Sequence, residues 1–168
     1  MTDDVRAADL DCEPLVGASA GQAMQRFISH AFRIRGRASR SEYWWWMLVN
    51  LMVVGLGRFV IPWITSDRTP NPTMLFGPFG SLFFANIPLF TVGDTPAPDS
   101  PVAAFALIVA GIWIIVTVIP GITVLIRRLH DSNMSGFWWL LAVLPLGTVL
   151  LLLFALRRSR PEGARFDA

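Results

Sequence analysis

The sequence contains no lysine, a single cysteine and few charged residues of any kind. Charged residues make up 15% of the 168 positions, whereas soluble domains carry about 25%. Hydrophobic residues make up 54%, more than a soluble core of this length can bury, and the length predicts one domain. The shortage of charge excludes an ordinary soluble protein and predicts an all-α membrane protein built as one small helical bundle.

The single cysteine, Cys12, excludes an intrachain disulfide bond and a cysteine-based metal cluster. Serine-hydrolase elbows, phosphate-binding loops, dinucleotide fingerprints and zinc-binding helix motifs are also absent from the sequence. We therefore predict no cofactor and no enzyme of a familiar class. The acidic first 25 residues lack the basic start and apolar stretch of a secretory signal peptide, so we expect the first spanning helix to direct insertion.

The charges are unevenly distributed along the chain. Residues 1–20 hold five of the 12 acidic residues and are interrupted by Pro14 and Gly17, which predicts a disordered cytosolic tail. Beyond position 13, thirteen arginines face seven acidic residues, which favours contact with anionic lipid headgroups. The arginines adjoin apolar segments, so we do not expect a nucleic-acid partner. A second copy of the chain or another membrane protein is the candidate protein partner.

Three apolar segments, at about 43–65, 102–126 and 137–156, are each long enough to predict a membrane-spanning helix. Residues 22–32 carry apolar side chains at spacings of three and four, which predicts a short amphipathic helix at the interface. The proline-rich residues 66–101 predict a membrane-associated loop. Within this loop, residues 74–92 are apolar enough to make a fourth crossing the alternative.

The number of crossings decides which polar segments share a membrane face. With three crossings and a cytoplasmic N-terminus, the arginine-rich entry segment at 33–46 and the Arg-Arg-Leu-His-Asp segment at 127–131 both face the cytosol. With four crossings, the bilayer separates the two segments. The arginine count favours four crossings, because residues 157–160 then return to the cytosol. The aromatic residues that follow each polar entry segment favour three.

Two residues of the first segment have a predicted structural role. Ser39 and Glu42 have the spacing of a capping box, and a carboxylate at a helix N-terminus also suits the helix dipole. We interpret Glu42 as a cap or ion-pair partner. Asn50 lies two turns into the first predicted helix, where it is expected to hydrogen-bond a neighbouring helix.

Residues 127–131 end the second predicted helix, and their basic side chains complement its negative end. The plainest interpretation is an interfacial anchor followed by a turn at 131–136. The alternatives are an ion pair between Asp131 or Glu42 and an arginine of the other segment, and metal binding or proton transfer at His130 and Asp131. We predict a polar cluster at the cytosolic face that contains Arg37, Arg40, Glu42, Asn50, Arg127, Arg128, His130 and Asp131.

The segments GRASRSEYWW and RRLHDSNMSGFWWLL, with Asn50 between them, resemble the DUF805 family of small bacterial inner-membrane proteins over about residues 20–166. The resemblance implies a multi-pass protein of the bacterial plasma membrane with no assigned activity. Its matched residues are Gly36, Arg37, Arg40, Glu42, Tyr43 and Trp44 in the first segment, and Arg127, Arg128, Leu129, His130, Asp131, Gly136, Trp138 and Trp139 in the second.

This chain departs from the family pattern in two places. Members often have a short connection between the first two helices, where this chain has the proline-rich residues 66–101. Similar proteins commonly end in a sequence like Gly-Pro-Asn-Arg-Tyr-Gly, and this chain has Pro-Glu-Gly-Ala-Arg-Phe-Asp at 161–167. We assign no function to that tail.

Three functions fit these observations. The first is a non-enzymatic membrane protein in which the two arginine-rich segments meet and lock helices together or bind a partner. The second is an oligomeric transport or channel subunit for an anion or small solute, with Arg37, Arg127 and Arg128 attracting the anion and Asn50 lining its path. The third is a lipid-modifying enzyme that uses His130 and Asp131 as acid-base groups.

Overall fold

The computed structural model describes residues 13–66, 100–143 and 147–167, and every regular element among them is helical. The predicted all-α fold is confirmed to that extent. The elements in chain order are α2 (Ala20–Ser29), α3 (Arg40–Gly55), the π-helical η1 (Leu56–Val60), α4 (Ile61–Ser66), α6 (Pro101–Asp131), the 3₁₀ helix η2 (Gly136–Val143), α7 (Gly147–Leu156) and the 3₁₀ helix η3 (Pro161–Phe166).

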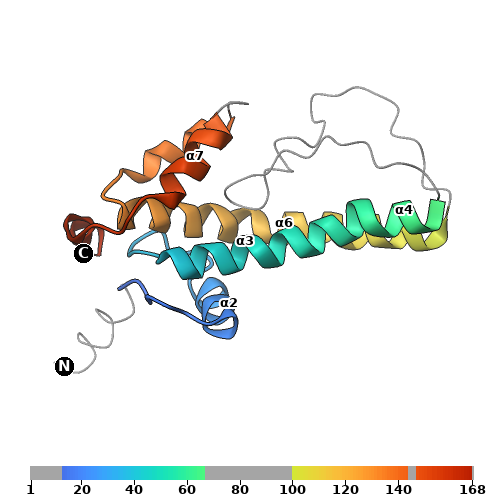
Figure 1. Ribbon diagram of the computed structural model, residues 1–168, viewed down its shortest axis with the longest axis horizontal. Coiled ribbons are helices and arrows are strands. Elements are labelled where there is room, and N and C mark those ends of the chain that lie inside the picture. The colour runs from blue at the N-terminus through green and yellow to red at the C-terminus, as the bar shows by residue number, and fades with distance from the viewer. Residues whose placement is uncertain (1–12, 67–99, 144–146, 168) are drawn as a thin grey trace.

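A long helical hairpin forms the body of the molecule. The elements α3, η1 and α4 follow one another directly and lie beside α6 along its length (Figure 1). With 31 residues, α6 is about 46 Å long, which exceeds the ~30 Å hydrocarbon core of a bilayer. By length and composition, α6 is the one helix among the described elements that could cross a membrane, with a mean hydropathy of 2.8 over its most apolar stretch.

Small residues allow the two arms of this hairpin to approach closely. Ala106 and Ala110 are buried on the face of α6 that meets η1. A Cβ atom added to Gly57 would lie 2.8 Å from Cβ of Ala110 and 3.2 Å from the carbonyl oxygen of Ala106. Close backbone contact through small residues is a common way for helices to associate in a membrane. Gly57 is therefore required by packing.

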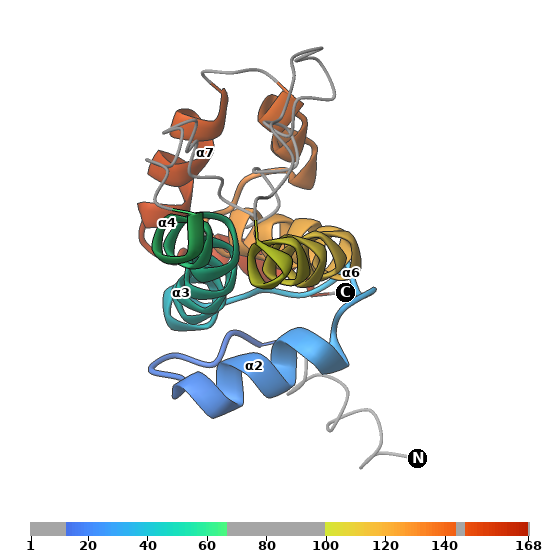
Figure 2. The same cartoon turned by 90° about the vertical axis from the view of Figure 1, so that its right-hand side faces the viewer.

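The helix α2 lies across one side of the hairpin, opposite to η2 and α7 (Figure 2). Its N-terminus has a capping box formed by Ser19 and Gln22. Phe27 of α2 stacks on Trp46 of α3, with 3.7 Å between the ring centroids. The sequence predicted an amphipathic helix here, and its buried face is the one that rests on α3.

The segment immediately before α2 differs from the predicted disordered tail. The backbone N–H of Leu15 donates to Glu42 at 3.2 Å, and the Ser39 hydroxyl donates to the Leu15 carbonyl at 2.7 Å. The indole N–H of Trp45 donates to the carbonyl of Ala18 at 3.0 Å. Hydrogen bonds to the start of α3 thus hold residues 13–19. The rest of the predicted tail (1–12) and most of the predicted loop at 66–101 (67–99) lie outside the described residues.

The C-terminal apolar segment also differs from its prediction, which was one helix over 137–156. The structure has two shorter elements, η2 and α7, that pack against each other and return the chain to the end of α6 (Figure 1). Each is about 15 Å long, half of a bilayer core. A Cβ atom on Gly147 would clash with the Leu141 carbonyl, so the packing of α7 against η2 requires glycine at this position.

The Gly57 contact generates a prediction about stability. Gly57→Leu forces the hairpin arms apart, and we expect the free energy of unfolding to fall by about 1–3 kcal/mol, as in other overpacked cores. Thermal unfolding of the purified protein in detergent measures the loss. Gly55→Leu is the matched control, because a Cβ atom on Gly55 meets nothing within 4 Å. Equal stability of the two variants would contradict the proposed contact.

Candidate functional site: the polar end of the hairpin

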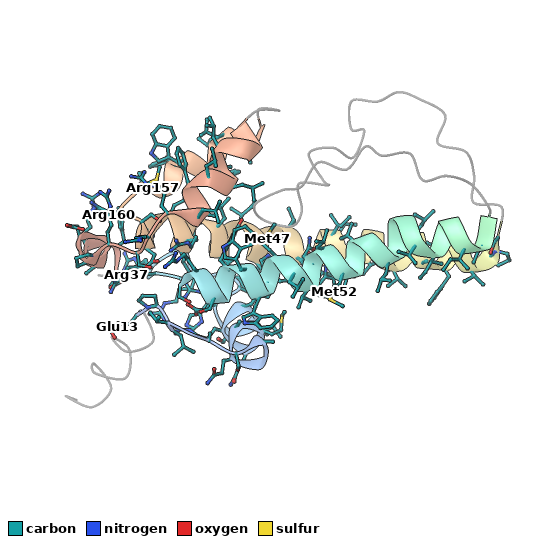
Figure 3. The ribbon with its side chains drawn as sticks, in the orientation of Figure 1. Glu13, Arg37, Met47, Met52, Arg157 and Arg160 are labelled. Carbon is teal, nitrogen blue, oxygen red and sulfur yellow. The ribbon has the colours of Figure 1, made fainter. Side chains whose placement is uncertain are left out.

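Four segments of the chain converge at one end of the hairpin. They are the start of α3, the last turn of α6, the extended residues 34–38 that precede α3, and the tail at 157–167. We call residues 34–38 the strap and residues 157–167 the tail. Figure 3 shows Arg37 of the strap near Arg157 and Arg160 of the tail, while Met52 lies farther along α3. This polar end contains most of the predicted cluster.

Arg128 and Asp131 form the centre of the polar end. Both are fully buried, and they pair with each other one turn apart on α6. Arg128 Nε donates to the carbonyl of Ala155 at 3.0 Å, and its Nη2 donates to the carbonyl of Arg157. The Ser159 hydroxyl donates to Asp131 at 2.5 Å. One buried ion pair therefore fixes the end of α7 and the beginning of the tail.

The strap runs along the last turn of α6. The backbone N–H of Ala38 donates to the carbonyl of Arg127 at 3.1 Å, and Nη2 of Arg127 donates to the carbonyl of Arg37 at 3.1 Å. Nδ1 of His130 hydrogen-bonds the carbonyl of Gly36 at 3.3 Å. The structure thus brings the two arginine-rich segments together, largely through backbone groups.

The tail completes the polar end, although its sequence predicts no role for it. Arg37 donates from Nε to Asp167 at 2.8 Å, and its Nη2 lies 2.7 Å from the same carboxylate. The ring of Phe166 stacks on His130 with 4.1 Å between centroids, and its carbonyl accepts from Gly36 N–H at 3.0 Å. Two charges of opposite sign 130 residues apart give no local sequence signal, so these contacts could not be found from spacing.

Glu42 has the role that its spacing predicts. It caps α3 with Ser39, whose backbone N–H donates to Glu42 at 2.7 Å, so the capping box is confirmed. Its ion-pair partner is Arg26 of α2, at 3.1 Å. The alternative prediction paired Glu42 with an arginine of residues 127–131. Among the described contacts, Glu42 has no such ion pair. Arg40 is exposed at the first position of α3.

Asn50 lies outside the polar end, inside the hairpin. It is 1% exposed, and its side-chain oxygen accepts a hydrogen bond from the indole N–H of Trp113 on α6 at 3.0 Å. The expected bond to a neighbouring helix is therefore present. Trp113 also stacks on Trp46 at 6.0 Å. This contact joins the two arms of the hairpin, and the sequence did not identify Trp113 as the partner.

The chemistry available at the polar end is hydrogen bonding between buried charges and backbone carbonyls. Within residues 13–66, 100–143 and 147–167, no group of three or more His, Cys, Asp or Glu side chains is arranged to hold a metal ion. Arg128 has all three of its side-chain nitrogens bound by protein acceptors. The arrangement can hold segments together without a bound ligand.

The ion pair between Arg37 and Asp167 predicts a change in tail mobility. Asp167→Asn removes the charge that Arg37 contacts, and a partly buried pair contributes up to about 1 kcal/mol, or roughly fivefold in tail opening. We expect trypsin to cleave after Arg158, which is followed by Ser159 in the same tail, faster by that factor, as measured by intact mass over time. Glu162→Gln, at an exposed position of the same tail, is the control. Identical cleavage of both variants and the parent would contradict the proposed role of the Arg37–Asp167 ion pair in holding the tail.

Comparisons with known proteins show the family of this chain. Residues 31–168 match the family described as "Protein of unknown function (DUF805)". The inner membrane protein YhaH of Escherichia coli K12 is 27% identical over 136 residues, which cover 79% of this chain and 82% of the relative. The inner membrane protein YhaI of the same strain is 29% identical over 120 residues, 71% of this chain and 70% of the relative. No solved structure gives a significant match. The chain belongs to the DUF805 family of membrane proteins.

Proposed function

We propose that this protein is a non-enzymatic structural or partner-binding protein of the bacterial inner membrane, and that its polar end is a lock on the cytosolic face. The lock holds the end of α6, the strap and the tail as one rigid unit. The observation that carries the proposal is that Arg128 and Asp131 are fully buried and bound by groups of the same chain. A site built for a substrate needs an opening to its charged groups.

The same contacts favour the lock over the two other functions. An anion-attracting site needs an accessible guanidinium, but Arg128 is 0% exposed and Arg127 is 2% exposed. The side chain of Asn50 is hydrogen-bonded to Trp113 inside the hairpin. This contact argues against Asn50 lining the path of an anion. Acid-base chemistry at Asp131 would require its carboxylate to leave both Arg128 and Ser159.

The positions of the arginines support two crossings with both ends of the chain in the cytosol. The long hairpin crosses the bilayer, and η2 and α7 dip into the cytosolic half and return. Cytosolic segments are enriched in arginine, and this topology puts eleven of the 12 arginines of the described residues on that face. These eleven are Arg26, Arg33, Arg35, Arg37, Arg40, Arg127, Arg128, Arg157, Arg158, Arg160 and Arg165.

The outer face of α6 is the proposed surface for the bilayer and for a membrane partner. Its large apolar side chains are well exposed, including Phe105 at 69% and Ile115 at 67%. Only 28% of its most apolar stretch is buried within the chain. Such a surface suits lipid tails or the helix of a second membrane protein. A lock that keeps the cytosolic end rigid would hold this face in one orientation.

The lock predicts a specific pattern of stability among three variants. Asp131→Leu leaves the positive charge of Arg128 buried without its ion-pair partner. Arg128→Met likewise leaves the negative charge of Asp131 buried and unpaired. We expect each to lower the free energy of unfolding by about 3–5 kcal/mol. The double variant removes both charges and is expected to recover part of that loss. Thermal unfolding in detergent and the amount of protein in isolated membranes measure the effect.

Arg158→Gln is the control for this series, because Arg158 is an exposed arginine of the same tail. Its expected change is below about 0.5 kcal/mol, as for most surface substitutions. The lock is refuted when the single variants of Arg128 and Asp131 are as stable as the control.

The proposed topology is tested by reporter fusions after residues 95, 132 and 168. We expect an active periplasmic alkaline phosphatase at 95, and fluorescent cytosolic protein at 132 and 168, because the hairpin of η2 and α7 returns the chain to its starting face. Three full crossings would give active phosphatase at 168. Four crossings would give active phosphatase at 132 and a cytosolic signal at 95.

A further inference from the structure

An apolar pocket opens beside the lock, between the strap, the last turn of α6, the start of η2 and the tail. Its volume is about 360 Å³, within the usual range of small-ligand pockets. The apolar walls come from Ile34, Ile126, Trp139 and Phe166. Phe137 also lines the pocket and is 80% exposed. The pocket is therefore accessible from the surroundings of the protein.

One polar side chain, that of His130, is both buried and directed into this pocket. His130 is 8% exposed, and its Nδ1 hydrogen-bonds the Gly36 carbonyl at 3.3 Å. A Cβ atom on Gly136 would lie 3.1 Å from Nε2 of His130, and Gly136 lines the pocket. In the part of the chain that the structure describes, Nε2 has no hydrogen-bond partner.

The hydrogen bond at Nδ1 fixes what Nε2 can bind. A backbone carbonyl only accepts, so Nδ1 carries the proton in the bond to Gly36. In the neutral imidazole, Nε2 then has a free lone pair and is an acceptor. A ligand in this pocket must therefore offer a donor such as a hydroxyl group.

Positive charge adjoins the pocket. Arg165 is exposed, and its guanidinium carbon lies 4.6 Å from the ring centroid of Phe166, a wall residue. Arg35 is also exposed and directly follows the wall residue Ile34. Exposed arginines at the edge of an apolar pocket complement a negatively charged headgroup whose chains continue into the bilayer.

We infer that this pocket binds an anionic phospholipid whose headgroup carries a free hydroxyl, with phosphatidylglycerol as the simplest example. The hydroxyl donates to Nε2 of His130, the phosphate lies near Arg165 and Arg35, and the first carbons of the chains contact Phe137 and Trp139. The site does not depend on the proposed lock function, because it uses the open side of His130 and not the buried ion pair.

The experiment is native mass spectrometry of the full chain released from detergent with one equivalent of each test lipid. Phosphatidylglycerol is compared with phosphatidylethanol, which has the same charge and no hydroxyl. Phosphatidylcholine tests the need for negative charge, and phosphatidylethanolamine tests an ammonium donor. We expect phosphatidylglycerol to exceed phosphatidylethanol by roughly fivefold, the size of one net hydrogen bond, and both to exceed phosphatidylcholine.

Two variants separate the hydroxyl contact from folding. His130→Phe keeps an aromatic ring to stack on Phe166 but removes the acceptor. Gly136→Ala keeps His130 and puts a methyl group 3.1 Å from Nε2 and 2.8 Å from Cγ2 of Ile126, the end of a side chain that has to shift. Both are expected to abolish the preference for phosphatidylglycerol over phosphatidylethanol while anionic lipids still exceed phosphatidylcholine. Should His130→Phe fail to fold, Gly136→Ala carries the test.

The charge contact has its own variants. Arg165→Gln with Arg35→Gln is expected to reduce the preference for anionic lipids, and Arg158→Gln, outside the pocket wall, is expected to leave it unchanged. The inference is overturned when the parent protein retains phosphatidylglycerol and phosphatidylethanol equally. It is also overturned when phosphatidylethanolamine binds best, or when Gly136→Ala folds and keeps the full preference.

Discussion

The burial of the Arg128 guanidinium is the constraint on which the polar end depends. A charge removed from water is costly unless every donor finds an acceptor. Here the acceptors are the carboxylate of Asp131 and the carbonyls of Ala155 and Arg157. Those carbonyls belong to the end of α7 and the residue after it, so the charge can be satisfied only when α7 ends beside α6. The return of η2 and α7 to the end of α6 follows from this requirement.

Other contacts of the polar end are arranged around that fixed point. With α7 ending at Leu156 beside α6, the tail packs against α6 and the strap. Arg160 N–H bonds the Asp131 carbonyl at 2.8 Å, and Phe166 reaches the ring of His130. The close packing of the tail on α6 requires glycine at position 163, because a Cβ atom there would clash with the carbonyl of His130. The tail therefore packs over the last turn of α6.

The parts of the fold that sequence predicted are those controlled by local pattern. The run of apolar residues before Arg127 predicts α6, and the Ser39–Glu42 spacing predicts the cap of α3, because both depend on neighbours in the chain. The segment 137–156 has the composition and length of a crossing helix, so composition alone could not distinguish it from η2 and α7. The pairs Arg37–Asp167 and Arg26–Glu42 join segments with no shared pattern. Their discovery required the three-dimensional arrangement.

The absence of lysine fits the geometry of the lock. The three nitrogens of Arg128 point in three directions and meet acceptors from α6, α7 and the tail. A guanidinium is planar, always charged and less strongly hydrated than an ammonium group, so it suits a buried site with several acceptors. An ammonium carries its donors on one nitrogen and cannot reach acceptors that lie around a planar fork. In this position, arginine binds three segments with one charge, and that is why a single ion pair can fix the end of the bundle.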